Sequence, residues 1–419
     1  MTDRTTPESG VVVPSGTVLR GRVVLPDGVI EDGLVVVDGD RLGYVGAVAG
    51  APAGITVPDP GRPAPTLLPG LVDLHCHGGG GASFPDATDV ETVRTGIAEH
   101  LRHGTTSLVA SLVTADEPTL LARTALLADL ADAGELAGIH LEGPYLSPAR
   151  CGAQDPAAMT EGRPDAVREI ARLARGHLVT MTVAPEIRGV TGHNGVVAAL
   201  AAHGALPSFG HTDATEESTR AALELAWSVL ARPGARSCRA TVTHLFNGMP
   251  PLHHREPGPV AACLAAAADG RAVVELVADG VHLAPGTIRT VFALLGPRAI
   301  VLVTDAMAAA GMPDGVYDLG GLAVRVADGV ARLVDGGAIA GSTSHLLDLV
   351  RTTVRSGVAL QDAVTAASAT PAEVLGCADI GVLEEGRRAD VVVVDDDLRP
   401  VQVIRRGVWV DIERSAPRC

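Results

Sequence analysis

Residues 67–75, Leu-Leu-Pro-Gly-Leu-Val-Asp-Leu-His, form the first of eight short apolar runs. The other seven runs are 106–112, 136–142, 178–185, 205–211, 240–244, 272–279 and 300–305. Continuous apolar runs of this length are typical of parallel strands that are buried on both faces. Longer helical stretches rich in Ala and Leu separate most of them, for example 89–103, 118–134, 216–230 and 284–295. The count of eight predicts an α/β fold of the (β/α)8 TIM-barrel type.

Both ends of the chain have a different character. Residues 17–57 and 389–410 contain short strand-like segments divided by Gly and Asp-Gly turns, a pattern that predicts antiparallel strands. Neither end has enough strands to be stable by itself, so we expect the two ends to form one small β-sandwich domain. The predicted division assigns 1–66 and 379–419 to this small domain and 67–378 to the barrel.

One segment interrupts the alternation of strands and helices in the barrel. Residues 307–340 contain Asp-Gly and Gly-Gly pairs, which predict an inserted hairpin. Two further helical stretches, 344–357 and 360–375, follow it.

Composition excludes several classes of partner and of chemistry. Of the 419 residues, 47% are apolar and 2% aromatic, and the net charge is −16 without a basic run, which argues against a nucleic-acid partner. The chain has no lysine, which excludes a lysine Schiff base and a carboxylated lysine as a metal bridge. The six cysteines form no CxxC pair, as in a reducing compartment. Without an apolar N-terminal stretch or a membrane-length run, we expect a cytoplasmic protein that has no membrane partner.

Polar side chains recur at the ends of the apolar runs. In a barrel of this type the carboxyl ends of the strands meet on one face, where the active site lies. We therefore expect a group of acids and histidines to converge there, namely His75, His77, His140, Glu142, His211, His244, His282 and Asp305.

His75 and His77 are one residue apart, so in a strand both imidazoles point inward and Cys76 points away. Four glycines, 78–81, follow them and allow backbone to approach a ligand closely. A pair of this spacing is a weak signal by itself, but its place after a buried strand favours a pair of metal ligands.

Glu142, His211 and His244 form a second predicted group. Two histidines and one glutamate, with an open position for water, are a known catalytic zinc arrangement. The alternatives are a salt bridge for Glu142 and buried structural roles for the histidines. Metal identity stays open, because such ligands also accept iron, cobalt or manganese.

Asp305 and His282 are the candidate catalytic residues. Asp305 ends the last predicted strand and could accept a proton from water and return it to a leaving group; its alternative role is a helix cap. His282 could bind a substrate oxygen or only support the site. Arg255 follows His253 and His254 in a loop, where its forked donors suit a phosphate, although most loop arginines are simply solvated.

The chain resembles the N-acetylglucosamine-6-phosphate deacetylases of the amidohydrolase superfamily along nearly its whole length. The segments that carry the resemblance are Pro69-Gly-Leu-Val-Asp-Leu-His-Cys-His-Gly-Gly-Gly-Gly, His140-Leu-Glu-Gly-Pro-Tyr, Gly210-His-Thr-Asp-Ala-Thr, Thr243-His-Leu-Phe-Asn-Gly-Met, Arg255-Glu-Pro-Gly, Ala278-Asp-Gly-Val-His, Val303-Thr-Asp-Ala and Ile339-Ala-Gly-Ser. Any one of these motifs alone would be weak evidence, and together they are specific.

The resemblance implies removal of the acetyl group from N-acetylglucosamine 6-phosphate, in amino-sugar catabolism and cell-wall recycling. It implies a divalent metal, with zinc the first choice, on Glu142, His211 and His244, and Asp305 as general base and then general acid. It also implies a set of sugar-phosphate contacts, namely Ala153, Gln154, Asn247, Gly248, Arg255, His282, Ile339, Ala340 and Gly341. The family's arginine commonly reaches a neighbouring subunit, which implies a homodimer.

Three positions depart from the family pattern. Gln154 stands where histidine is more common, and Gly248 replaces a usual alanine. His75 and His77 are present where some members lack them, which predicts a second ion with Glu142 as the bridge. The alternatives are an epimeric N-acetylhexosamine 6-phosphate as substrate, or another amidohydrolase activity such as a deaminase or cyclic amidase.

Overall fold

The computed structural model describes residues 16–61, 63–232 and 234–412. Eight parallel strands in the order β14-β13-β12-β11-β10-β9-β8-β5 form its central sheet. Their bounds are β5 Leu71–Cys76, β8 Thr105–Leu112, β9 Gly138–Glu142, β10 Leu178–Val183, β11 Leu206–Phe209, β12 Ala240–Val242, β13 Ala272–Leu276 and β14 Ile300–Leu302. All of these strand residues are buried, as their apolar sequences predict.

The sheet closes where its first and last strands meet. The Asp305 amide donates to the His75 carbonyl at 2.8 Å, and the His77 amide donates to the Ala306 carbonyl at 2.7 Å. At the same seam the Asp73 carboxylate accepts hydrogen bonds from the backbone N–H and the hydroxyl of Thr304. The predicted α/β barrel is confirmed.

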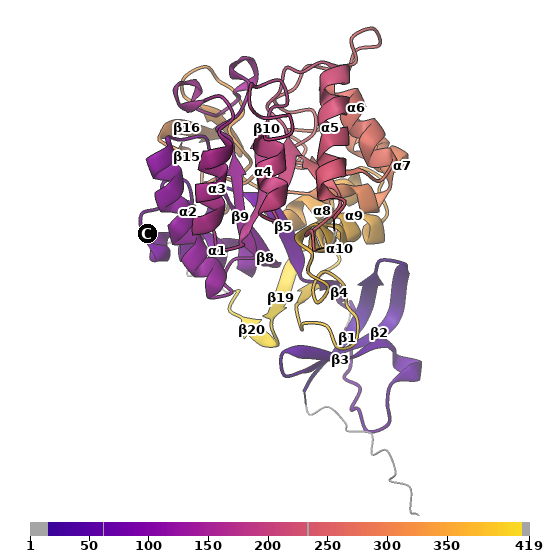
Figure 1. Ribbon diagram of the computed structural model, residues 1–419. Coiled ribbons are helices and arrows are strands. Elements are labelled where there is room, and N and C mark those ends of the chain that lie inside the picture. The colour runs from indigo at the N-terminus through magenta and orange to yellow at the C-terminus, as the bar shows by residue number, and fades with distance from the viewer. Residues whose placement is uncertain (1–15, 62, 233, 413–419) are drawn as a thin grey trace, which may run out of the picture.

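Helices surround the barrel (Figure 1). They are α1 Val90–Arg102, α2 Glu117–Asp132, α3 Pro164–Leu173, α4 Val196–Ala202, α5 Glu216–Leu230, α6 Gly258–Ala268, α7 Pro285–Leu295, α8 Leu346–Arg355, α9 Leu360–Ala367 and α10 Ala369–Leu375. Asp89, Asp116 and Thr215 cap α1, α2 and α5 by accepting a backbone N–H of the first turn. None of the described helices is long and apolar enough to cross a bilayer.

Strands from both ends of the chain form a second, mixed sheet in the order β20-β19-β18-β4-β1-β2-β3. Their bounds are β1 Thr17–Leu25, β2 Gly28–Asp38, β3 Arg41–Ala47, β4 Thr66–Pro69, β18 Val391–Val394, β19 Pro400–Arg405 and β20 Val408–Val410. The ends therefore pair as predicted, in one continuous sheet rather than in two separate sheets. Residues 1–15 and 413–419 of the predicted small domain lie outside the described residues.

The first apolar run is not one strand. Residues 67–75 divide at Gly70 between β4 of the terminal sheet and β5 of the barrel. A Cβ at Gly70 would lie 2.1 Å from the Thr106 hydroxyl and 2.7 Å from the Asp390 Cβ, so only glycine fits this junction without a shift. The domain boundary near residue 66 stays a prediction.

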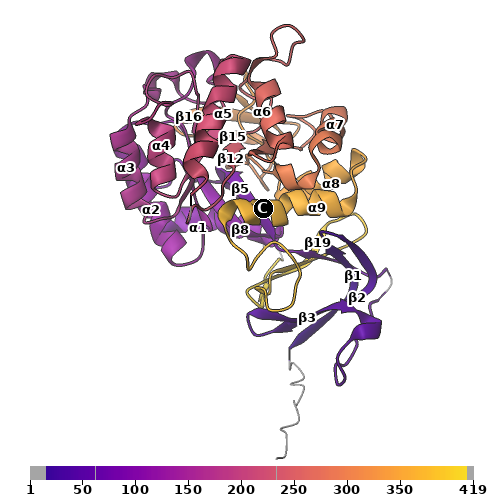
Figure 2. The same ribbon diagram turned by 45° about the vertical axis from the view of Figure 1, so that its right-hand side comes forward.

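An antiparallel sheet of three strands lies within residues 307–340, with β15 Gly315–Leu319, β16 Leu322–Ala327 and β17 Val330–Leu333. It packs through its own small apolar cluster, which includes Leu319, Val324 and Ala340. Figures 1 and 2 show this sheet at one end of the barrel and the terminal sheet at the opposite end.

Candidate metal centre

A cavity of about 240 Å³ lies at the carboxyl ends of the barrel strands. Its walls come from strand ends and from the loops that follow them. The lining residues are His77, Glu142, Gly152, Ala153, Gln154, His211, His244, Asn247, Gly248, His282, Asp305, Leu319, Ala338, Ile339 and Gly341. The structure therefore brings most of the polar residues that were expected at the strand ends into one space.

Glu142, the last residue of β9, is 3% exposed and lies among the histidines that converge on this cavity. Its Oε1 atom lies 2.9 Å from the Nε2 atoms of both His211 and His244. The two Nε2 atoms are themselves only 3.0 Å apart. Three donor atoms thus face one point.

The other carboxylate oxygen of Glu142 faces a second group. Its Oε2 atom lies 3.2 Å from His77 Nε2 and 3.7 Å from His75 Nε2. The two imidazole nitrogens are 3.0 Å apart. Asp305 Oδ1 lies 3.4 Å from His75 Nε2 and 3.3 Å from His77 Nε2. Glu142 therefore joins two clusters, with one oxygen toward each.

This donor set fits a divalent cation. Two imidazole nitrogens 3.0 Å apart can share only one proton, whereas a cation between them satisfies both, and histidine with carboxylate is a ligand set that zinc accepts. Burial by itself would raise the pKa of Glu142, but His75 and His211 lower it well below its usual range. Burial would lower the pKa of His75, but Asp305 and Glu142 raise it well above its usual range. The site therefore favours positive charge.

Asp305 is electrostatically similar to Glu142. Burial by itself would raise its pKa, but His75 and His77 prevail and lower it below its usual range. The Asp305 carboxylate is therefore ionised at neutral pH, and it lies at the edge of the cavity beside the cluster.

Backbone conformation at the cluster is unusual. His211, His244 and Asp305 have φ values of 47°, 28° and 47°, in the left-handed region that residues other than glycine rarely adopt. Such conformations concentrate at functional sites, where the surrounding structure maintains them. At Gly248, with φ 61°, a Cβ would lie 2.9 Å from His211 Nδ1.

Comparison with known proteins supports this description. A model of the amidohydrolase family matches residues 66–411. An N-acetylglucosamine-6-phosphate deacetylase of Bacillus subtilis is 33% identical, over 92% of this chain and 98% of its own. The chain belongs to the N-acetylhexosamine-6-phosphate deacetylases of the amidohydrolase family. An N-acetylgalactosamine-6-phosphate deacetylase of Escherichia coli O157:H7 is 35% identical, over 93% of this chain and 98% of its own.

Solved structures of the deacetylase family agree with the fold. A Mycobacterium smegmatis N-acetyl-D-glucosamine-6-phosphate deacetylase, in complex with N-acetyl-D-glucosamine 6-phosphate, is 40% identical with a TM-score of 0.85, and the match covers 94% of this chain and 99% of that chain. An enzyme of the same name from Thermotoga maritima is 29% identical with a TM-score of 0.79, over 94% and 99% of the two chains.

Not every residue expected from the deacetylase family lies at the cavity. Ala340 is fully buried in the apolar cluster of the β15–β17 sheet, whereas its neighbours Ile339 and Gly341 line the cavity. Arg255 is exposed and lies outside the lining of the cavity.

Gln154, the departure from the deacetylase family pattern, lines the cavity and also contacts the cluster. Its amide donates to Glu142 Oε2 at 2.6 Å, while its carbonyl accepts the Thr114 backbone N–H at 2.7 Å. The glutamine is thus held between backbone and carboxylate.

Two acids of the site were not predicted from the sequence. Glu275 Oε2 lies 3.1 Å from His75 Nδ1, and Asp279 Oδ2 lies 2.8 Å from His282 Nδ1. Burial by itself would lower the pKa of His282, but Asp279 raises it above its usual value. The available signal was the presence of two acids, Glu275 and Asp279, within the apolar run 272–279, where an unpaired charge is costly.

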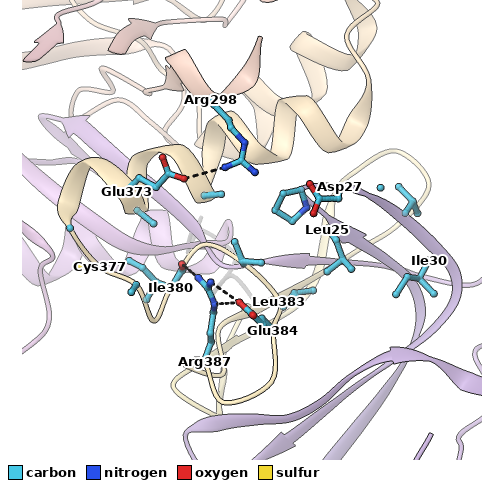
Figure 3. Close-up of a pocket in the computed structure, with 18 residues that line it drawn as sticks. Leu25, Asp27, Ile30, Arg298, Glu373, Cys377, Ile380, Leu383, Glu384 and Arg387 are labelled. Atoms are coloured by element: carbon cyan, nitrogen blue, oxygen red, sulfur yellow. Dashed lines mark hydrogen bonds and ion pairs between the residues drawn. The ribbon is translucent and has the colours of Figure 1, made fainter. Parts of the chain in front are cut away.

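A larger cavity of about 860 Å³ lies between the β1–β2 turn and α10 (Figure 3). Four of its charged side chains form ion pairs, Arg298 with Glu373 at 3.3 Å and Arg387 with Glu384 at 2.6 Å. No histidine is among the described residues that line it, so it lacks the donor set of a metal-dependent hydrolase.

Proposed function

We propose that the chain hydrolyses the N-acetyl group of N-acetylglucosamine 6-phosphate and releases acetate and glucosamine 6-phosphate. The observation that carries this proposal is the single cavity in which Glu142, His211 and His244 converge beside Asp305. The relatives described above, which share about a third of the sequence over nearly the whole chain, supply the substrate class.

Glu142, His211 and His244 would hold one divalent cation, with zinc as the first choice. His75 and His77 would hold a second, with Glu142 as the bridge. When bound, such a cation supplies Lewis-acid chemistry, which lowers the pKa of water and polarises an amide carbonyl. The absence of lysine from the chain leaves the bridging role to a carboxylate.

Asp305 carries the proton of the reaction. Its carboxylate accepts a proton from the water molecule as the water oxygen forms a bond to the acetyl carbon. When the carbon–nitrogen bond breaks, Asp305 donates this proton to the leaving nitrogen, so that the products are an amine and acetate. One residue thus serves first as base and then as acid.

His282 orients the acetyl group. Asp279 accepts the Nδ1 proton of His282, which leaves Nε2 available toward the cavity that His282 lines. We assign Nε2 to hydrogen bonding with the carbonyl oxygen, where negative charge develops during attack. Gln154 holds Glu142. We assign the sugar contacts to Asn247, Gly248, Ile339 and Gly341, which line the cavity.

None of the described residues that line the cavity is an arginine, so the same chain offers the phosphate no guanidinium there. We propose that Arg255 binds the phosphate in a second copy of the chain, which makes the enzyme a homodimer. The exposed position of Arg255 outside its own cavity supports this assignment. Arg255→Ala should raise KM for the phosphorylated sugar about 10-fold or more with little change in kcat. An unchanged KM would contradict the assignment.

N-acetylgalactosamine 6-phosphate is the second candidate substrate, because the E. coli relative that is 35% identical is named for it. The test is a comparison of kcat/KM for acetate release from both phosphorylated sugars and from unphosphorylated N-acetylglucosamine. We expect the glucosamine derivative to be preferred and the unphosphorylated sugar to be poor. Preference for the galactosamine derivative would reassign the substrate, and ammonia release from nucleobases without acetate release would favour a deaminase.

A further inference from the structure

Glu275 is a buried acid that the proposed mechanism does not use. It lies on β13 between Val274 and Leu276 and is only 1% exposed. Transfer of a carboxylate from water into an apolar interior is unfavourable unless hydrogen bonds compensate for the lost hydration. Among the described residues no arginine pairs with Glu275, so its compensation comes from other groups.

Both compensating groups belong to the metal cluster. Glu275 Oε2 lies 3.1 Å from His75 Nδ1, and it accepts the backbone N–H of His244 at 3.3 Å. His75 comes from β5, and where the barrel closes β14 lies between β5 and β13. The Glu275 side chain therefore bridges barrel strands that are not neighbours. One carboxylate oxygen thus contacts one histidine of each cluster.

The contact with Glu275 decides which nitrogen of His75 faces the cluster. An imidazole that donates Nδ1–H to a carboxylate presents the lone pair of Nε2 on its opposite side. His75 Nε2 is the atom that lies near Asp305, at 3.4 Å, and near His77 Nε2, at 3.0 Å. The hydrogen bond therefore fixes both the tautomer and the ring orientation that a metal ligand needs.

Among the other three histidines of the two clusters, only His211 has a partner at Nδ1. His211 Nδ1 is held by the Arg150 backbone carbonyl at 2.7 Å. The Nδ1 atoms of His77 and His244 are buried without a hydrogen-bond partner among the described residues. Each cluster therefore has one imidazole whose Nδ1 atom is held by a hydrogen bond. The partner is the Arg150 carbonyl for His211 and the Glu275 carboxylate for His75.

We propose that Glu275 is a positioning residue that sets the affinity of the His75–His77 side for a divalent cation. This inference rests on the proposed metal site but not on the choice of sugar. Its effect falls mainly on the second cation, because Glu275 contacts the imidazole of His75 but only the backbone N–H of His244.

The test compares Glu275→Leu, which removes the acceptor, with Glu275→Gln, which keeps an uncharged one. Purified enzyme is stripped of metal with a chelator, checked for folding by circular dichroism, and titrated with Co²⁺ and then with Zn²⁺. The absorption of Co²⁺ and elemental analysis give the affinity and number of the ions bound. We expect Glu275→Leu to weaken the second ion about 10- to 100-fold, and Glu275→Gln to weaken it about 3- to 10-fold.

The matched control is Glu99→Gln, which alters another buried carboxylate that contacts a histidine, His345, at 3.0 Å. We expect this variant to bind both ions as the wild type does. Equal weakening of both ions in Glu275→Leu, or wild-type affinity for the second ion, would overturn the proposal. Should Glu275→Leu not fold, unchanged binding of the second ion by Glu275→Gln would overturn it. Acetate release plays no part in this readout, so failure of the proposed activity would be recognised separately.

Discussion

Asp305 lies where the last barrel strand meets the first, within 3.4 Å of His75 and 3.3 Å of His77. The two histidines keep its pKa low despite burial, so the carboxylate can accept a proton at neutral pH. We predict that Asp305→Asn lowers kcat for acetate release about 10²- to 10⁴-fold, because the amide cannot take up the proton. Assays of acetate release measure this loss of rate, and elemental analysis shows whether metal stays bound.

The ion held by Glu142, His211 and His244 should remain in this variant, because Asp305 belongs to the other cluster. The control is Asp318→Asn, at an exposed position of β15, which should keep wild-type activity. Acetate release by Asp305→Asn within a few-fold of the wild type would remove Asp305 from the mechanism.

Much of the cluster could be predicted from residue spacing. His75, His77, Glu142 and His211 lie at or just after the ends of short apolar runs, and the closure of the barrel brings these positions together. Residue spacing could not predict the contacts of Glu275 or the burial of Ala340. The orientation of an acid inside a strand depends on which face of the pleat is inside, and the burial of Ala340 depends on how the inserted sheet packs.

At the scale of elements, the junction between β4 and β5 connects the two sheets. We predict that Gly70→Ala destabilises the protein by about 1–3 kcal/mol, because the added Cβ meets Thr106 and Asp390 in close-packed surroundings. Denaturant unfolding, followed by circular dichroism, measures this change.

Gly286→Ala is the matched control. Gly286 lies in the first turn of α7, and a Cβ there has no atom within 4 Å. Since alanine favours helix over glycine, this variant should be neutral or more stable by up to about 1 kcal/mol. Equal destabilisation by the two substitutions would contradict the close approach at Gly70.

The same junction explains an error of strand prediction. The run 67–75 is predicted as one strand, although Pro69-Gly70, a dipeptide common in turns, interrupts it. The chain changes sheet because Gly70 permits close contact with Thr106 and Asp390, residues that are distant in the sequence. The dipeptide marks a break, but contacts with residues this distant, which put the two halves in different sheets, are not visible in local patterns.

For the whole molecule, a buried network that joins α1 to the start of α8 contributes to stability in acid. Glu99 Oε1 lies 3.0 Å from His345 Nε2, and Glu99 Oε2 accepts a hydrogen bond from Arg102 at 2.5 Å. Burial by itself would raise the pKa of Glu99, but His345 and His103 lower it from 4.5 to about 2. A carboxyl whose pKa is lower in the folded state stabilises the fold above its unfolded pKa.

We predict that Glu99→Gln lowers the free energy of unfolding by about 3 kcal/mol at pH 7. The difference from the wild type should persist down to about pH 4.5 and shrink as the pH falls toward 2, because the wild-type carboxylate becomes protonated over this range. Denaturant unfolding at several pH values measures it. Glu224→Gln, at an exposed position of α5, should change stability by less than about 0.5 kcal/mol. A difference for Glu99→Gln that does not vary with pH would contradict this account.

The central claim is that this cluster removes acetate from a phosphorylated N-acetyl sugar with the help of a bound cation. The direct measurement is acetate release from N-acetylglucosamine 6-phosphate by one enzyme preparation, before chelation, after chelation, and after return of Zn²⁺. We predict acetate and glucosamine 6-phosphate in equal amounts at first, loss of at least about 90% of the rate after chelation, and recovery with Zn²⁺. No acetate from metal-loaded enzyme, or a rate that chelation leaves unchanged in protein shown to be free of metal, would contradict the claim.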